Sequence, residues 1–257
     1  MSSAARIEVL DTAEALATTV AGALLRTLAE VQAAGREPQV VLTGGTIAEA
    51  VHREVARLSP GSGVDWDRVH LWWGDERFVP RDSPDRNAGQ ARAAFIDALG
   101  VPAERVHEVA STEQAADVDE AATAYAAELA EHAPDGFDVV MLGVGPDAHV
   151  ASLFPGHPQV HVTDVDAVGV TGSPKPPPER VSLTYRALNR TRATWFLVSG
   201  EGKAEAVSRA LAGGLSQEAT DGTDGTDGPT VDDVPAVGAS GREQTVWFLD
   251  REAASRL

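Results

Sequence analysis

Apolar residues along the chain form two kinds of pattern. Short continuous runs rich in Val, Leu, Phe and Trp predict buried strands, and longer segments with apolar residues every three or four positions predict amphipathic helices. Strands are predicted at 40–43, 69–73, 137–142, 181–183, 194–198 and 246–249. Helices are predicted at 12–31, 47–58, 87–98, 116–132 and 202–211, with Asp11 or Thr12 as a cap of the first and Asn87 as a cap of the third.

This alternation is typical of an α/β protein with a largely parallel, Rossmann-like sheet flanked by helices on both faces. Ligands of such sheets bind on loops at the carboxyl ends of the strands. The composition does not shift along the chain, so a single domain over residues 1–257 is expected. A proline-rich segment at 173–178 predicts an extended loop, and an acidic segment at about 215–230 with a repeated Asp-Gly-Thr predicts a flexible surface loop.

Charge and composition narrow the possible partners. The chain has 39 acidic and 21 basic side chains, a net charge of −18, which would repel nucleic acids and anionic membranes. No apolar run approaches the ~18 residues that span a bilayer, and no secretory signal is visible, so a cytoplasmic protein is expected. Cysteine is absent, which excludes disulfides and thiolate chemistry, and no metal site is expected. We expect a monomer, with a weak homodimer as the alternative.

A glycine-containing loop, Gly143-Val144-Gly145-Pro146-Asp147-Ala148, directly follows a predicted strand and has the spacing of a dinucleotide-binding loop. Dinucleotide binding also needs a long helix that begins at this turn. Pro155 and Pro158 would end any helix after about two turns, so a nicotinamide cofactor is not expected. The glycines still allow backbone N–H groups to approach an oxygen-rich ligand.

The same loop carries Asp147 and His149. Histidine has an ordinary pKa near 6.5, so it is mostly neutral at cellular pH and can accept a proton. A neighbouring carboxylate can orient the ring and stabilise the imidazolium that forms. Many loop histidines are structural or simply exposed, and at this point a structural and a catalytic role for His149 both remain open.

Three further loops after predicted strands offer positive charge or backbone N–H groups. Thr43-Gly44-Gly45-Thr46 leads into a helix and has the arrangement of a phosphate cradle. Arg77 follows the adjacent Trp72-Trp73, whose rings are predicted to face opposite layers, and a guanidinium suits phosphate or an oxyanion. Asp75-Glu76-Arg77 could equally be a solvated charge cluster. Lys203 stands at another strand-to-helix turn. Since cations or N–H groups thus follow three separate strands, an anionic ligand is predicted despite the acidic surface.

These blocks, in this order, resemble the 6-phosphogluconolactonases over nearly the whole chain. The most specific are Trp73-Gly74-Asp75-Glu76-Arg77 with Val79-Pro80, and the block from Asp147-Ala148-His149 through Ser152-Leu153-Phe154-Pro155. The remaining blocks are Ser173-Pro174-Lys175-Pro176-Pro177 through Arg180, Ser182-Leu183-Thr184, Ser199-Gly200 with Lys203, and Trp247-Phe248-Leu249-Asp250.

The resemblance implies a sugar-phosphate-isomerase-like α/β fold and hydrolysis of 6-phospho-D-glucono-1,5-lactone in the oxidative pentose phosphate pathway. It implies that His149 is the general base that activates water, that Asp147 positions it and that Arg77 offers charge to the phosphate or the oxyanion. The implied substrate and phosphate contacts are Gly44, Gly45, Thr46, Asp75, Arg180 and Lys203. The partner would be a small anionic sugar-phosphate lactone, and no cofactor or metal is required.

Two departures from the family pattern concern backbone geometry. The family usually has Gly where this chain has Ala148, and the phosphate loop usually continues Gly-Gly-Ser-Thr-Pro where this chain has Gly45-Thr46-Ile47. An alanine that needed positive φ at 148 would strain the loop by roughly 1 kcal/mol or more.

Two alternative functions stay open from the sequence. A glucosamine-6-phosphate deaminase shares the fold, but its loop continues toward Phe-Asn-Glu-Pro, whereas this chain has Ser152-Leu153-Phe154-Pro155 and lacks the glutamate. A non-catalytic sugar-phosphate-binding domain of a transcriptional regulator would need a DNA-binding module, and neither end offers a basic helix-turn-helix.

Overall fold

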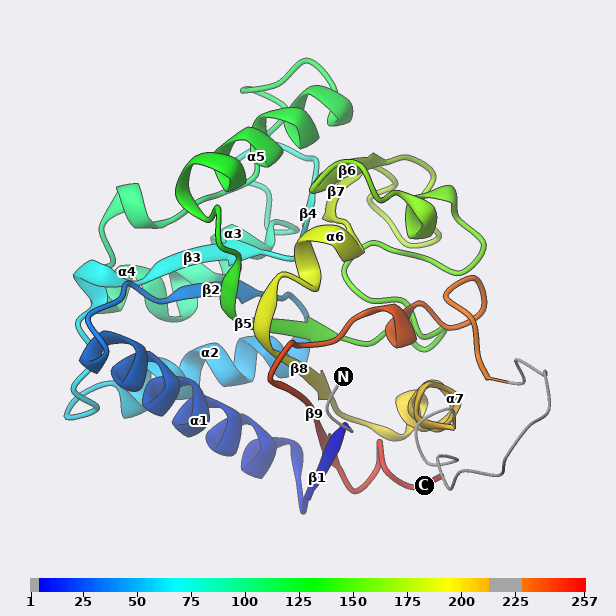
Figure 1. Ribbon diagram of the computed structural model, residues 1–257, viewed down its shortest axis with the longest axis horizontal. Coiled ribbons are helices and arrows are strands. Elements are labelled where there is room, and N and C mark those ends of the chain that lie inside the picture. Colours follow the sequence, from blue (N-terminus) through cyan, green and yellow to red (C-terminus); the bar gives the residue numbers. More distant parts are fainter. Residues whose placement is uncertain (1–4, 213–227) are drawn as a thin grey trace.

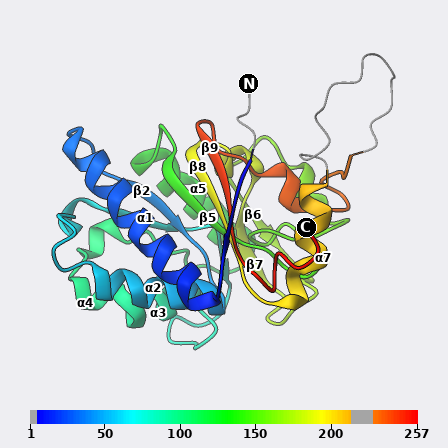
Figure 2. The same ribbon diagram turned by 90° about the horizontal axis from the view of Figure 1, so that it is seen from below.

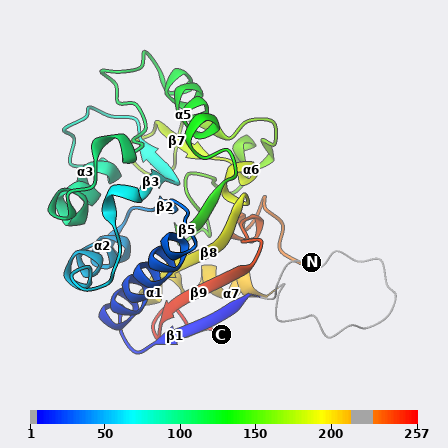
Figure 3. The same ribbon diagram turned by 60° about the vertical axis from the view of Figure 1, so that its left-hand side comes forward.

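The computed structural model describes residues 5–212 and 228–257 (Figure 1). Its main sheet has six strands, all parallel, in the order β1-β9-β8-β5-β2-β3, and Figure 3 shows them in this order. The bounds are β1 Arg6–Leu10, β2 Gln39–Leu42, β3 His70–Trp73, β5 Phe137–Gly143, β8 Thr191–Val198 and β9 Gln244–Asp250. The prediction of an α/β protein with a largely parallel sheet is confirmed. Apart from 228–230, the acidic loop predicted at about 215–230 lies outside the described residues.

A second, antiparallel sheet has the order β4-β7-β6, with bounds β4 Asp75–Arg77, β6 Ala167–Val170 and β7 Arg180–Leu183. The strand predicted at 181–183 therefore belongs to this small sheet and not to the main one. β4 follows β3 after a single residue, Gly74, whose carbonyl accepts a hydrogen bond from the Leu183 N–H (2.8 Å). The sequence analysis did not predict β1, β4 or β6. β1 and β4 are short and contain charged residues, and the four-residue β6 is interrupted by a glycine.

Helices cover both faces of the main sheet (Figure 2). α1 Ala13–Ala33, α2 Thr46–Leu58, α3 Asn87–Ala91 and α4 Asp97–Leu99 lie on one face, and a π-helical turn, Arg92–Ile96, joins the last two. α5 Val118–His132, α6 Tyr185–Leu188, α7 Ala204–Leu211 and the small sheet lie on the other. Trp72 packs in the core of the second face and Trp73 in that of the first, and both are fully buried, as their alternation predicted. No helix among the described residues is long and apolar enough to cross a membrane.

Two predicted helix caps have different outcomes. Thr12 caps α1 as expected, since its hydroxyl accepts a hydrogen bond from the Ala15 N–H (3.2 Å). The prediction that Asn87 caps its helix is wrong, because Asn87 is the first helical residue and Arg86 precedes it. Glu76 of β4 does the capping instead: its carboxylate accepts hydrogen bonds from the N–H groups of Asn87 and Ala88 (2.8 Å each).

A buried histidine on α2 predicts how stability depends on pH. His52 packs against Phe95, with ring centroids 5.1 Å apart, and burial lowers the pKa of His52 to about 4. The unfolded chain, with a histidine pKa near 6.5, therefore binds more protons between these two values, and this contribution to stability is lost as pH falls from about 6.5 to about 4. The measurement is the free energy of unfolding of His52→Leu and of the wild type in urea at pH 7.5 and at pH 5. When the pH is lowered from 7.5 to 5, we expect the difference between them to shift by about 1–2 kcal/mol in favour of His52→Leu.

The control for this experiment is His161→Leu, which removes an exposed histidine and so shows whether the gain in stability at pH 5 requires the loss of a buried one. An equal difference between His52→Leu and the wild type at both pH values would contradict the expectation.

Candidate active site

A cavity of about 240 Å³ opens at the carboxyl ends of the parallel strands. The loops after β2, β5 and β8 line it, together with β4 and the proline-rich segment before β7. Of the residues predicted from the sequence, those on its lining are Gly44, Gly45, Asp75, Arg77, His149, Arg180 and Lys203. Thr46 lines an adjoining cavity that shares Gly45 and Arg77, and Asp147 lies directly beside His149. The fold thus brings the predicted residues together.

The centre of the cavity wall is the pair formed by Asp147 and His149. His149 Nδ1 lies 2.5 Å from Asp147 Oδ1, and the His149 side chain is only 14% exposed. Burial is the largest single influence on the pKa of Asp147 and raises it, but the hydrogen bond with His149, the charge of His149 and backbone hydrogen bonds together lower this pKa to about 2. Asp147 is therefore ionised at neutral pH and accepts the Nδ1 proton, which leaves Nε2 of a neutral ring as a proton acceptor.

The backbone of this loop has no room for a side chain at Gly145. A Cβ there would lie 2.0 Å from His149 Nδ1 and 2.4 Å from Asp147 Oδ1. The Gly145 N–H donates to the His149 carbonyl (2.9 Å), and the Ala148 N–H donates to the Gly145 carbonyl (2.9 Å). Glycine at 145 therefore lets the chain turn tightly beneath the Asp147–His149 pair, and no dinucleotide-binding helix follows this turn.

Arg77 lies at the end of β4 and is held from one side. Its Nη1 donates to the carbonyl of Asp85 and to Oδ1 of Asn87, both at 2.7 Å. Asn87 is 3% exposed and also lines the cavity, although the sequence analysis assigned it only to a helix cap. The contact joins residues ten positions apart in different elements, and no local pattern in the sequence predicts it.

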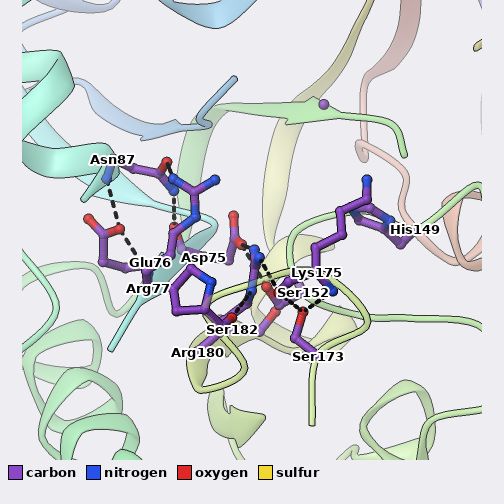
Figure 4. Close-up of polar contacts among 12 residues, drawn as sticks. Asp75, Glu76, Arg77, Asn87, His149, Ser152, Ser173, Lys175, Arg180 and Ser182 are labelled. Carbon is purple, nitrogen blue, oxygen red and sulfur yellow. Dashed lines mark hydrogen bonds and ion pairs between the residues drawn. The ribbon is translucent and has the colours of Figure 1, made fainter. Parts of the chain in front are cut away.

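Asp75 and Arg180 belong to a buried network beneath the cavity (Figure 4). Asp75 Oδ2 accepts a hydrogen bond from the Ser152 hydroxyl (2.6 Å) and lies 3.6 Å from Arg180 Nη1. Arg180 also donates to the carbonyls of the proline-rich segment, those of Lys175 (3.1 Å), Pro176 (3.4 Å) and Pro177 (3.3 Å). Most donors of Arg180 are thus engaged within the protein, and burial lowers its pKa. Arg180 anchors the proline-rich loop against the site.

Comparison with known proteins places this chain in a family. Residues 11–247 match the family model described as glucosamine-6-phosphate isomerases/6-phosphogluconolactonase. The chain belongs to this family. A 6-phosphogluconolactonase of Streptomyces coelicolor is 42% identical over 100% of this chain and 96% of its own length. The 6-phosphogluconolactonase of Mycobacterium tuberculosis is 39% identical over 98% of both chains.

Solved structures of the family agree with the fold. The crystal structure of the 6-phosphogluconolactonase from Thermotoga maritima superimposes with a TM-score of 0.77 at 28% identity, and the match covers 96% of this chain and 99% of the Thermotoga chain. The structure of the Trypanosoma brucei 6-phosphogluconolactonase matches the fold with a TM-score of 0.82 at 24% identity, over 98% of each chain. The resemblance drawn from the sequence motifs is confirmed.

The alanine at the position where the family usually has glycine adopts a left-handed conformation. Ala148 has φ 69° and is fully buried, with its methyl group in the hydrophobic core. Its carbonyl accepts a hydrogen bond from the Ala236 N–H (3.0 Å). Burial of the methyl group offsets part of the cost of positive φ, about 1–2 kcal/mol, so an alanine is accommodated at this position.

Both lysines of the chain line the cavity. Lys203 Nζ donates to the Val144 carbonyl (2.7 Å), and its pKa is lowered by burial and further by the positive charge of Lys175. The side chain of Lys175 points toward the part of the cavity that holds His149 (Figure 4). Lys175 was known from the sequence only as part of a motif; the rarity of lysine is the signal that could have identified it. Among the described lining residues four cations face a single carboxylate, Asp75.

The described residues include no group of three or more histidine and acidic side chains placed to hold a metal ion. The chemistry that this family member's site can perform with its own side chains is proton abstraction by His149 beside a cluster of cations, which suits an anionic substrate.

Proposed function

We propose that this protein hydrolyses 6-phospho-D-glucono-1,5-lactone to 6-phospho-D-gluconate in the oxidative pentose phosphate pathway. The observation that carries the proposal is the Asp147–His149 pair on the wall of a cavity that also holds Lys175, Lys203 and Arg77. Relatives at 39–42% identity over nearly the full chain bear the name 6-phosphogluconolactonase, which supports the same conclusion.

In the proposed mechanism, His149 Nε2 takes a proton from a water molecule as that water attacks the lactone carbonyl carbon. The carbonyl oxygen becomes an oxyanion in the tetrahedral intermediate, and preorganised cations or N–H groups nearby lower its energy. When the intermediate collapses, the bond between this carbon and the ring oxygen breaks and the ring oxygen receives the proton held by His149. Asp147 keeps the ring oriented and stabilises the transient imidazolium through Nδ1.

The cations and glycines divide between two tasks in this proposal. Lys175 and Lys203 bind the phosphate, together with the N-terminus of α2 at Gly44-Gly45-Thr46, where backbone N–H groups and the helix dipole favour an anion. Arg77 offers its free guanidinium edge to the phosphate or the oxyanion. Asp75 and Arg180 pair with each other, and Arg180 holds the proline-rich loop. Their proposed role is therefore to support the cavity wall rather than to bind the substrate directly. These steps use side chains and water alone, so the proposal invokes no cofactor; we further propose a cytoplasmic, single-domain monomer.

The deaminase alternative is less compatible with the site. Where a deaminase carries the Glu of Phe-Asn-Glu-Pro, this chain has Phe154 of Ser152-Leu153-Phe154-Pro155, and Phe154 is buried. Asp75 is the one carboxylate among the described lining residues, and it is engaged with Ser152 and Arg180. The site therefore lacks a free carboxylate for ring opening.

The test is the purified protein with freshly generated 6-phosphogluconolactone, with spontaneous hydrolysis subtracted. We expect acceleration with this substrate, a much weaker effect with unphosphorylated glucono-1,5-lactone, and no ammonia from glucosamine 6-phosphate. Absence of acceleration together with retained binding of 6-phosphogluconate would replace the enzyme proposal with a sugar-phosphate-binding domain. Release of ammonia would favour the deaminase.

A further inference from the structure

Asn87 holds Arg77 through a side-chain amide whose two ends have different partners. Its Oδ1 accepts a hydrogen bond from Arg77 Nη1 (2.7 Å), and its Nδ2 donates to the Asp75 carbonyl (2.9 Å) (Figure 4). The opposite orientation of the amide would place an NH₂ group against the guanidinium and two oxygens against each other, so the partners decide the orientation. Position 87 thus requires a buried acceptor and a buried donor at once.

The side chain of Asn87 is free to face the cavity because Glu76 takes over its capping role. The buried Glu76 carboxylate accepts hydrogen bonds from the N–H groups of Arg77, Asn87 and Ala88, each at 2.8 Å. These bonds tie β4 to the first turn of α3. An asparagine that begins a helix would otherwise compete for the same N–H groups.

Asn87 also contacts the glycine loop after β2. A Cβ at Gly44 would lie 2.0 Å from Asn87 Oδ1 and 2.6 Å from its Cγ, so the amide lies directly against the Gly44 backbone. The single side chain of Asn87 therefore contacts β4 and the loop that leads into α2, and both line the cavity.

We propose that Asn87 is a positioning residue that sets which edge of the Arg77 guanidinium faces the substrate, an inference that rests on the proposed lactonase function. Both hydrogens of Arg77 Nη1 are engaged, one by the Asp85 carbonyl and one by Asn87. Within residues 5–212 and 228–257, no acceptor takes a hydrogen from Nη2. This arrangement leaves the Nη2 edge for the anionic group of the substrate, and loss of the Asn87 acceptor allows the guanidinium to turn away.

A double-mutant cycle on lactone hydrolysis tests the inference, with kcat and KM measured for Arg77→Ala, Asn87→Ala and the double variant. We expect Asn87→Ala to lower kcat/KM about 10- to 100-fold, through whichever of kcat or KM changes in Arg77→Ala. In the Arg77→Ala background the same substitution should cost no more than about twofold, because its effect acts through Arg77. Asn189→Ala is the matched control, because the Asn189 amide also accepts a hydrogen bond (from the Ser240 N–H, 2.9 Å) and donates one (to the Gly238 carbonyl, 2.8 Å) but lines neither cavity. This variant should match the wild type.

The proposal would be overturned if the two single-variant losses in kcat/KM multiplied in the double variant. It would also be overturned if Asn87→Ala changed the kinetic parameter that Arg77→Ala leaves intact, or if Asn87→Ala kept the wild-type kcat and KM. Asn87→Ser is a second variant, for the case that Asn87→Ala does not fold, because its hydroxyl keeps a polar group beside the buried Asp75 carbonyl. Its oxygen lies one bond closer to the backbone than the Asn87 amide oxygen and does not reach Arg77 Nη1, so the variant should weaken the same parameter as Arg77→Ala. Wild-type activity of Asn87→Ser would contradict this, whereas a wild type without lactonase activity would refute the proposed function itself.

Discussion

Replacement of His149 by alanine is expected to lower kcat for lactone hydrolysis about 10²- to 10⁴-fold, with KM changed far less. The reason is that Nε2 of His149 is the proposed acceptor of the water proton, and the remaining cations bind the substrate without activating water. The measurement is steady-state hydrolysis of freshly generated 6-phosphogluconolactone, with the spontaneous rate subtracted.

The chain contains a matched control for this substitution. His161 forms the same kind of pair with Asp232 (His161 Nε2 to Asp232 Oδ1, 2.8 Å), but both side chains are more than half exposed and neither lines the cavity. His161→Ala should therefore keep the wild-type kcat. If His149→Ala retained full acceleration while folded, His149 would not be the general base.

The second large effect is expected for Asp147→Asn, which should lower kcat about 10²- to 10⁴-fold without unfolding the protein. The carboxylate of Asp147 accepts the Nδ1 proton and keeps Nε2 unprotonated, whereas the NH₂ group of an asparagine donates to Nδ1 and moves the ring proton to Nε2. That tautomer cannot accept a proton from water. The pKa of Asp147 near 2 means that the carboxylate stays ionised down to about pH 3, so its protonation does not limit activity near neutral pH.

This substitution has a readout other than rate. Nitrogen NMR of the histidine side chains should show the His149 proton on Nδ1 in the wild type and on Nε2 in Asp147→Asn. Asp232→Asn is the matched control and should leave both kcat and the His149 signal unchanged. An Asp147→Asn variant with the wild-type kcat would show that the pair is structural.

Much of the site follows from short-range features of the sequence. Asp147 and His149 are two residues apart on one loop, so their contact needs only the tight turn that Gly145 permits. The phosphate cradle is likewise a local arrangement, Gly44-Gly45-Thr46 at the start of a helix. Because loops after parallel strands share one edge of the sheet, the pattern of strands and helices also predicted that Arg77 and Lys203 would meet His149.

The partners of these groups could not be read from the sequence. Asp75 accepts a hydrogen bond from Ser152, which lies 77 positions further along the chain. Arg180 donates to carbonyls of the proline-rich loop, and this loop places Lys175 on the cavity lining. Glu76 caps a helix from a different element, which releases Asn87 for Arg77. None of these pairs has a spacing that a helix or strand period would reveal.

The sequence by itself thus determined the α/β class, the edge of the sheet at which the ligand is proposed to bind and the proposed base with its carboxylate, because hydrophobic periodicity, glycine and short-range hydrogen bonds act within a few residues. Only the tertiary structure decided that β4 and β7 pair in a separate small sheet, that Arg180 anchors a loop and that Asn87 lines the cavity. These features depend on which buried donors and acceptors meet once distant segments pack together. A buried polar group must find a partner wherever the fold places one.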